Sequence, residues 1–396
     1  MKKLIKIILI IAVVSVGIYA FDMYSGYSIS KYVDEKIHFT AAPNEPASIQ
    51  TNHNVQGLNA QLYSQLSDED KKMYDTIYYG VSEHKNPIFI GFNQESEKVF
   101  DMLKIVLCEH PELFWNNGNC SFSSSGYLTV NYSCSKEEAQ VKALQIEAKV
   151  NEILSSLSGG EQEKAAKLFD YVVESTEYDF ENVGNIENVP TISSIEGVFL
   201  DGKAVCGGYA KAYQYLLQKA GMQALYVTGE ANSPEGEQRH GWVCQQINGE
   251  NYFSDPTWSD CFESQSYSDF ISHTYFCLNS NEISATHTCD DKFSNIISDK
   301  SSYNYFKQQG LYFEDYNTAD IRAAIKNRLE ENQVGVELKF SSDEVYHQAV
   351  EGLIDKQELY YILISLDLFS VNISTTQVSY SEDETHNVLT IFYEKK

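Results

Sequence analysis

The chain has few basic residues for its length. Its 396 residues include 29 Lys and Arg against 56 Asp and Glu, which gives a formal net charge of -27 at pH 7. Because the acidic groups are spread along the chain, a phosphate backbone would be repelled. The composition therefore argues against nucleic acid as a partner.

Several motifs are also missing. Paired Cys-x-x-Cys steps, which mark many zinc sites, do not occur. An aspartate-rich loop of the EF-hand type is absent, so calcium has no predicted site. There is no repeat of solenoid period and no low-complexity tract. We predict no metal and no cofactor in an otherwise ordinary globular sequence.

Cys206 stands immediately before an apolar pattern with helical spacing. Gly207 and Gly208 follow it, and Gly221 occupies the expected stop position. Cys206 is therefore predicted to lie at the N-terminus of a helix of about four turns, where free N–H groups and the helix dipole favour a thiolate. Glycines at the next two positions are expected to let a substrate backbone come close. The apolar residues are Tyr209, Ala210, Tyr213, Leu216, Leu217 and Ala220.

A hairpin is predicted downstream of this helix. Asn248-Gly249 is a strong signal for a two-residue type I′ turn, which pairs Ile247 with Glu250. Counting along the two strands brings Asp255 opposite Trp242, so that His240 and Asp255 are diagonal neighbours on one face. A slip of one residue would separate the pair.

Each of these residues alone is commonly structural. A buried cysteine is usually a small core residue, and an aspartate before proline is usually a turn former. Cys206, His240 and Asp255 together, with a helix start under the thiol, indicate an activated thiol nucleophile.

The chain resembles the transglutaminase-like superfamily, in particular its bacterial cell-surface branch. The likeness covers most of residues 60 to 290. Upstream and downstream segments, Pro111 to Trp115, Tyr178-Asp179, Tyr275-Phe276 and His287, also look like that branch. The main matching boxes are Val205-Cys206-x-Gly208-Tyr209-Ala210-x-Ala212, Ala220-Gly221, Val227-x-Gly229, His240-x-Trp242 and Asp255-Pro256-Thr257-Trp258.

The resemblance implies an α+β, papain-like fold in which the cysteine helix packs on an antiparallel sheet. It implies Cys206 as the nucleophile, His240 as general base and acid, and Asp255 as the residue that orients the imidazole. The neighbours expected to support the site or contact the substrate are Gly207, Gly208, Tyr209, Trp242 and Trp258.

Two features depart from the family pattern. The family commonly has His-Ala-Trp-Asn where this chain has His240-Gly241-Trp242-Val243, so one amide is absent. The backbone N–H of Cys206 is the natural first donor of an oxyanion hole. No residue of the sequence matches the second donor.

Such a site performs acyl transfer through a thioester. Water as the acceptor makes a peptidase or deamidase, whereas a lysine amine makes a cross-linking enzyme, and the residues leave both open. The expected substrate is a protein or a cell-wall peptide. The alternative is a transglutaminase-fold binding or scaffold module without turnover.

The N-terminus predicts the location. Lysines at positions 2, 3 and 6 precede an apolar run, so residues 4–21 are a signal anchor or a cleaved signal peptide. By the positive-inside rule, the rest of the chain lies outside the cytoplasm, anchored to the membrane or secreted.

The domain plan follows the changes of pattern along the chain. We expect a signal segment at 1–21, a spacer at 22–56, a helical region with a hairpin at 57–157, the catalytic domain at 158–300 and a small α+β domain at 310–396. Within the last, one helix is expected over 343–367.

Eight cysteines are present. With Cys206 set aside, seven remain, so at least one more is unpaired if the others form bridges. Cys120 and Cys134 flank the expected hairpin at Gly126 and are the best candidates for a disulfide. Cys244 is expected to be a core residue, and most of the others buried thiols.

Overall fold

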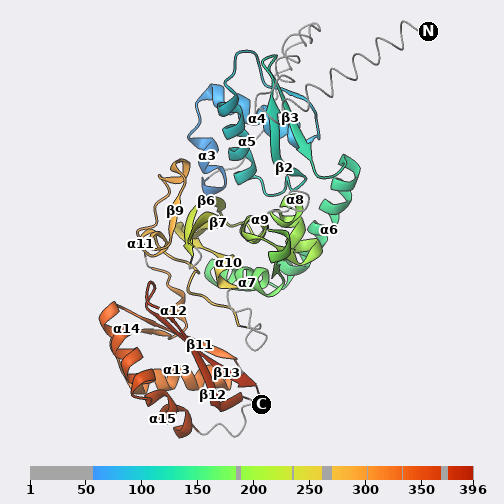
Figure 1. Ribbon diagram of the computed structural model, residues 1–396. Coiled ribbons are helices and arrows are strands. Elements are labelled where there is room, and N and C mark those ends of the chain that lie inside the picture. The colour runs from blue at the N-terminus through green and yellow to red at the C-terminus, as the bar shows by residue number, and fades with distance from the viewer. Residues whose placement is uncertain are drawn as a thin grey trace, which may run out of the picture. The chain divides into compact units, whose positions relative to one another are not determined.

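The computed structural model describes most of the chain (Figure 1). The predicted segments 1–21 and 22–56, as well as Cys261, lie outside the described residues. Among the residues that are described, no helix is long and apolar enough to cross a membrane. The described ranges are 57–183, 189–233, 236–260, 270–300, 302–331, 333–366 and 373–395.

The chain forms two compact units. Among the described residues the first holds Gln65–Leu107 and Asn116–Lys136, and the second holds residues up to Ser64, Cys108–Trp115 and everything from Glu137 onward. The second unit contains all the residues of the predicted catalytic site.

The first unit combines two helices with a small antiparallel sheet of order β1-β3-β2. The predicted hairpin about Gly126 is present. Apolar residues at helical spacing run from 58 to about 79, but Ser67 caps a new helix there by accepting a hydrogen bond from Asp70 N, so the segment does not form one continuous helix. The elements are α4 (Asp68–Ser82), α5 (Ser96–Glu109) apart from its end, β1 (Ile88–Phe89), β2 (Asn116–Phe122) and β3 (Tyr127–Tyr132), while η1 (Gly57–Ala60) and α3 (Gln61–Ser64) belong to the second unit.

The second unit has a helical layer against a four-stranded antiparallel sheet of order β8-β7-β6-β9 (Figure 1). Helix α9 packs against β6 and β7 and also contacts α7. The strands are β6 (Ala224–Ser233), β7 (Gly236–Ile247), β8 (Glu250–Ser254) and β9 (His287–Cys289), and the helices are α6 (Lys136–Ser155), α7 (Glu161–Glu174), α8 (Val189–Ile192), α9 (Cys206–Lys219) and α10 (Pro256–Ser259).

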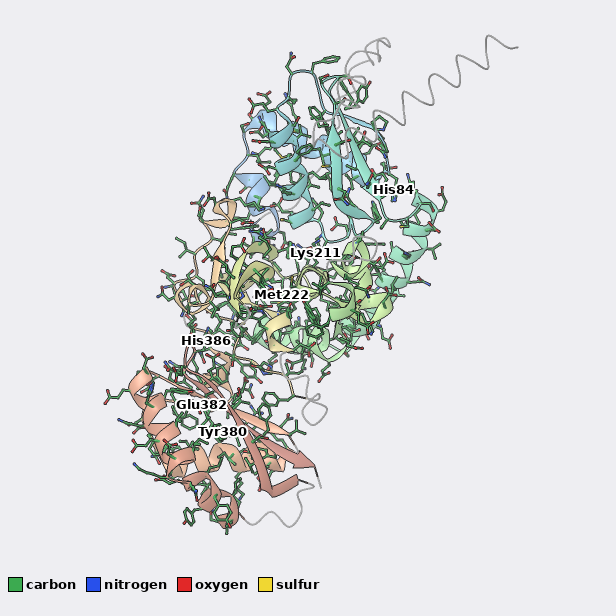
Figure 2. The ribbon with its side chains drawn as sticks, viewed as in Figure 1. His84, Lys211, Met222, Tyr380, Glu382 and His386 are labelled. Atoms are coloured by element: carbon green, nitrogen blue, oxygen red, sulfur yellow. The ribbon has the colours of Figure 1, made fainter. Side chains whose placement is uncertain are left out.

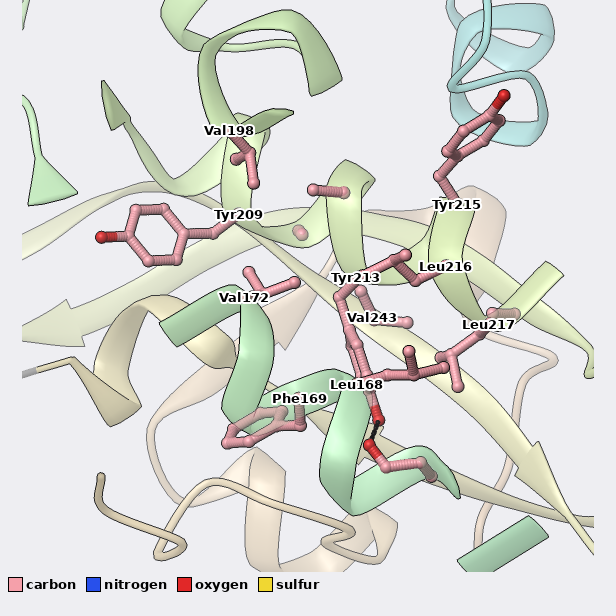
Figure 3. Packing of buried hydrophobic residues seen from close by; sticks show 14 of the residues in the cluster. Leu168, Phe169, Val172, Val198, Tyr209, Tyr213, Tyr215, Leu216, Leu217 and Val243 are labelled. Atoms are coloured by element: carbon pink, nitrogen blue, oxygen red, sulfur yellow. Dashed lines mark hydrogen bonds between the residues drawn. The ribbon is translucent and has the colours of Figure 1, made fainter. Parts of the chain in front are cut away.

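The core between this sheet and its helices is apolar (Figure 3). Leu168 and Phe169 of α7 meet Tyr213 of α9, and Val243 of β7 closes the cluster. The Tyr213 hydroxyl donates a hydrogen bond to the carbonyl of Ala165 at 3.2 Å, so its one polar group is satisfied inside the core. Each such apolar side chain stabilises the fold by about 1.5–3 kcal/mol relative to exposure. This core holds α9, and therefore Cys206, in a fixed position on the sheet.

The C-terminal part has its own sheet, β10-β11-β13-β12, and a separate apolar cluster. The predicted single helix 343–367 is wrong, because Gln357 adopts a left-handed backbone with φ +61° that stops the helical hydrogen bonds. The elements are β10 (Tyr312–Phe313), α13 (Thr318–Glu330), β11 (Gly335–Phe340), α14 (Asp343–Val350), η5 (Glu351–Asp355), α15 (Glu358–Ser365), β12 (Ile373–Asp383) and β13 (Val388–Lys395).

A buried carboxylate joins the two halves of the second unit. Glu337 on β11 accepts hydrogen bonds from Ser272 Oγ at 2.5 Å, His273 N at 2.8 Å and Thr274 Oγ1 at 3.0 Å. At the turn between β12 and β13, His386 packs edge to face on Tyr275 with 4.8 Å between the ring centroids (Figure 2). The C-terminal sheet is thus attached to the loop that follows the catalytic hairpin.

Candidate active site

Cys206 is the first residue of α9, as the spacing predicts. The preceding Val205 is extended and supplies no side-chain cap. The N–H groups of the first helical turn therefore lack a capping side chain, and their partial positive charge lies beside the sulfur. Cys206 is a half-exposed thiol at the positive end of a helix.

The structure explains the need for glycine after Cys206 differently from the sequence analysis. Both are buried. A β-carbon at Gly208 would lie 2.4 Å from the carbonyl oxygen of Ile192 and 2.7 Å from the Ala204 β-carbon. The prediction that these glycines open the backbone to a substrate is wrong for Gly208, because the chain itself fills that space.

His240 and Asp255 meet as the hairpin register requires. The ladder pairs Ile247 with Glu250 and continues to Val243 opposite Ser254, one step before Trp242 and Asp255. His240 Nε2 and Asp255 Oδ2 are 2.7 Å apart, and both side chains are buried. Because Nε2 is used by the carboxylate, Nδ1 is the ring nitrogen left for Cys206.

The electrostatics favour a charged imidazole. Burial alone would lower the pKa of His240, but the charge and hydrogen bond of Asp255, with help from a hydrogen bond with Cys206, raise it to about 10. Burial opposes ionisation of Asp255 as well, yet His240 and His287 keep the pKa of that carboxyl well below its usual range. At neutral pH the pair is an imidazolium and a carboxylate, and the positive charge lies beside the Cys206 sulfur.

The carboxylate of Asp255 has every acceptor position used. Oδ1 caps α10 by accepting hydrogen bonds from the N–H groups of Thr257 at 2.9 Å and Trp258 at 3.3 Å. Oδ2 lies 3.3 Å from Nε2 of a second imidazole, His287, in addition to His240. Asp255 is therefore held in one orientation from two sides.

The resemblance includes His287 only as a downstream segment and implies no role for it in the site. It begins β9, and its Nδ1 lies 2.8 Å from Thr286 Oγ1. Burial lowers its pKa, so it is neutral at pH 7. The ligand atoms of His240, Asp255 and His287 lie within 4.8 Å of one another, so this group could hold a metal ion, although the hydrogen bonds account for the spacing.

Two of the predicted aromatic residues, Trp258 and Trp242, pack against the imidazole pair. The Trp258 ring centroid is 5.5 Å from that of His240 and 4.6 Å from that of His287. Trp242 is fully buried and stacks on His240 at 6.3 Å. Tyr209 is also buried, and its hydroxyl donates to the Thr176 carbonyl at 2.9 Å and contacts Asp260 Oδ2 at 2.5 Å. Of these three residues, Trp258 lines the cleft described next.

Cys206 and His240 share a cleft of about 1380 Å³. Tyr178 and Trp258 line it within the transglutaminase-like part, and the turn between β12 and β13 lines it from the C-terminal sheet. A cleft of this size accommodates an extended polypeptide side chain with its flanking backbone. Residues 381–385, from the end of β12 into the turn, and Thr390 on β13 contribute to this lining.

The departures from the family pattern have local causes. A β-carbon at Gly241 would lie 2.4 Å from the hydroxyl oxygen of Tyr226, so alanine at this position would displace that tyrosine. Val243 is fully buried in the apolar core, where an amide side chain would lack its usual partners. Gly241 and Val243 therefore each fit the residues that pack around them in this chain.

The predicted disulfide is absent. No disulfide joins Cys120 and Cys134. A register shift in β2 pairs Cys120 with Val130, so the two cysteines are not opposite each other. Cys108, Cys244 and Cys277 are buried free thiols, as expected for most of the cysteines.

The comparison with family models agrees with this architecture at the level of class. The chain contains mixed helix and sheet around a transglutaminase-like core, since residues 147–259 match the model of the transglutaminase-like superfamily. A solved chain described as "Crystal structure of a TGase" is similar at 20% identity, with a TM-score of 0.28, over 33% of this chain and 35% of that one. This chain therefore spans about a third of that structure. No curated protein matches.

Proposed function

We propose that the protein is a cysteine enzyme that performs acyl transfer or amide hydrolysis. The observation that carries the proposal is the contact of His240 with buried Asp255, at 2.7 Å, in the same cleft as a thiol at a helix start. Cys206 is the nucleophile, His240 the general base and acid, and Asp255 the residue that orients the imidazole.

The reaction begins with the thiolate form of Cys206. Its sulfur attacks a substrate carbonyl, and the electron pair of the C=O bond moves to oxygen. The N–H groups at the start of α9, that of Cys206 first, stabilise this oxyanion. The C–N bond then breaks as the His240 imidazolium gives its proton to the departing amine. The product of this half-reaction is a thioester.

The thioester is resolved by a second nucleophile. His240, now neutral, accepts a proton from water or from an amine, and the S–C bond breaks to regenerate the thiolate. Water yields hydrolysis, and an amine yields cross-linking. The open cleft admits either acceptor.

The proposed substrate is a protein or a cell-wall peptide outside the cytoplasm. This part of the proposal rests on the charged start and apolar run of residues 4–21. An acidic, soluble surface of net charge -27 is compatible with work outside the cell.

Alkylation of Cys206 by iodoacetamide tests the enzyme proposal. Because the His240 imidazolium and the N-terminus of α9 lie beside the sulfur, Cys206 is expected to react faster than free cysteine. The rate at pH 6 should exceed that of free cysteine at least tenfold. Cys206→Ala should lose this fast phase, and Cys120→Ala, which removes a half-exposed free thiol in the first unit, should keep it.

A Cys206 rate no faster than that of free cysteine would contradict the enzyme proposal and favour the scaffold alternative. If the fast phase is present, glutamine-containing peptides with and without an amine probe separate transfer from hydrolysis. Incorporation of the amine indicates transfer, whereas release of ammonia or a peptide fragment without incorporation indicates hydrolysis.

A further inference from the structure

The two glycines that follow the catalytic cysteine and histidine both border one hydroxyl group. A β-carbon at Gly207 would lie 3.5 Å from the Tyr226 hydroxyl oxygen, and one at Gly241 would lie 2.4 Å from it. Gly207 follows Cys206 and Gly241 follows His240. The Tyr226 hydroxyl therefore lies between the start of α9 and the middle of β7, near the two glycines that directly follow Cys206 and His240.

The position of Tyr226 follows from the sheet. Tyr226 lies on β6 and pairs with Val243 on β7. Its ring is half-buried, and Lys211 Nζ lies over it, 5.2 Å from the centroid. Lys211 in turn donates a hydrogen bond to the Ser193 carbonyl at 3.1 Å, so the cation is held in place on α9 (Figure 2). The ring is thus fixed by the strand on one side and by a cation on the other.

The hydroxyl is available as a donor. It makes no hydrogen bond with another described residue, although a phenol near a packed core usually finds a partner. Burial, and then the charge of Cys206, raises the pKa of Tyr226 well above its ordinary value, so the group stays protonated. A fixed, protonated and unpaired donor beside a nucleophile is the requirement for stabilising a developing oxyanion.

We propose that the Tyr226 hydroxyl is the second donor of the oxyanion hole, acting together with the backbone N–H of Cys206. This inference rests on the function proposed above. When the Cys206 sulfur bonds to the substrate carbon, negative charge gathers on the carbonyl oxygen. Tyr226 donates a hydrogen bond to that oxygen and keeps its proton, and the bond is released when the C=O bond re-forms and the amine leaves. Tyr226 is then a catalytic residue that contacts the reacting atoms.

Two reactions of the same thiol test the proposal in the full chain. Acylation by p-nitrophenyl acetate passes through an oxyanion, whereas alkylation by iodoacetamide displaces iodide directly and needs no such donor. In Tyr226→Phe the acylation rate is expected to fall about 10- to 100-fold while the alkylation rate stays within twofold of wild type. Tyr215→Phe removes a hydroxyl from α9 that bonds Glu147 and should change neither rate.

Each other outcome overturns the proposal. If Tyr226→Phe acylates as fast as wild type, the hydroxyl is not an oxyanion donor. If both rates fall together, Tyr226 positions or activates the thiol instead. A wild-type Cys206 that neither alkylates nor acylates faster than free cysteine overturns the proposed function, and this inference with it. Fast reactions in wild type combined with unchanged rates in Tyr226→Phe overturn the inference alone.

Discussion

At the scale of single residues, the charge state of His240 decides how the site works. Its imidazole is surrounded by apolar and aromatic groups, which favour the neutral form, and by the Asp255 carboxylate, which favours the cation. The carboxylate prevails because it is fully buried and only 2.7 Å away. In the mechanism that we propose, this ion pair activates Cys206.

Removal of the carboxylate charge should lower the pKa of His240. In Asp255→Asn it is expected to fall from about 10 toward the ordinary value of about 6.5. Observation of the His240 ring protons across pH by NMR measures this shift directly. The alkylation rate of Cys206 at pH 6 should fall at least tenfold in the same variant, and a titration midpoint that stays near 10 would contradict the assigned partner.

The ion pair also predicts a pH dependence of stability. The folded state raises the pKa of His240, so the pair contributes stability fully below about pH 6.5 and loses it as pH rises through about 10. The depressed pKa of Asp255 adds stability that is lost under acid conditions. Between pH 6.5 and pH 10, the melting temperature of His240→Gln should fall less than that of wild type. Equal decreases in melting temperature would contradict the linkage.

His287 is expected to act by positioning Asp255. In His287→Asn the carboxylate loses one of two imidazole partners, so kcat should fall about tenfold with little change in KM. His287→Gln, whose longer amide can reach the carboxylate, should restore part of the loss. A pure packing role would lower thermal stability in both variants while leaving kcat at permissive temperature unchanged.

At the scale of elements, the contact between α9 and α8 depends on the absence of a side chain. Gly208 faces the backbone carbonyl of Ile192, and backbone atoms cannot move aside as a flexible side chain can. The start of α9, which carries Cys206, can therefore lie close to α8 only because Gly208 has no side chain.

Gly208→Ala should destabilise the protein by about 1–3 kcal/mol, because the added methyl group would lie 2.4 Å from that oxygen. Gly160→Ala, at the N-cap of α7 with open space around it, is the control and should cost less, because the added methyl group meets no atom and only the N-cap preference for glycine is lost. Urea unfolding of the three proteins measures the difference. Equal midpoints would show that the α9 start is not tightly packed.

At the scale of the whole molecule, the second unit joins the transglutaminase-like core to a separate α+β sheet. The attachment depends on buried Glu337, which is 4% exposed and satisfies three donors of the 272–274 loop. That loop leads directly to Tyr275, which lines the cleft. The C-terminal sheet therefore supports the site that it helps to line.

Glu337→Ala should leave buried donors of Ser272, His273 and Thr274 without a partner. The expected loss is about 3 kcal/mol in the free energy of unfolding. Glu344→Ala, an exposed carboxylate on α14, should cost less than about 0.5 kcal/mol. Calorimetric unfolding of both variants measures these losses in the free energy of unfolding. A loss for Glu337→Ala as small as that for Glu344→Ala would show that the loop is held by other contacts.

Local patterns in the sequence were sufficient to predict the elements of the candidate site. The start of α9 at Cys206 and the turn at Asn248-Gly249 depend on residues a few positions apart, as does the meeting of His240 with Asp255 across that turn. Helix spacing and turn geometry are properties of short segments, so sequence alone determined them. Where a cap or a left-handed residue intervened, at Ser67 and Gln357, periodicity missed the break.

Contacts between distant segments were decided only by the tertiary structure. Tyr226 lies beside Gly207 and Gly241, His287 shares a carboxylate 32 residues earlier, and Glu337 binds a loop more than 60 residues upstream. None of these has a signal within its own segment, because each depends on which elements pack together. Cys120 and Cys134 show the same limit, since a register shift that no short pattern predicts keeps them apart. The sequence determined the positions of Cys206, His240 and Asp255 on their own elements, and only the packing of sheet and helices decided what surrounds them.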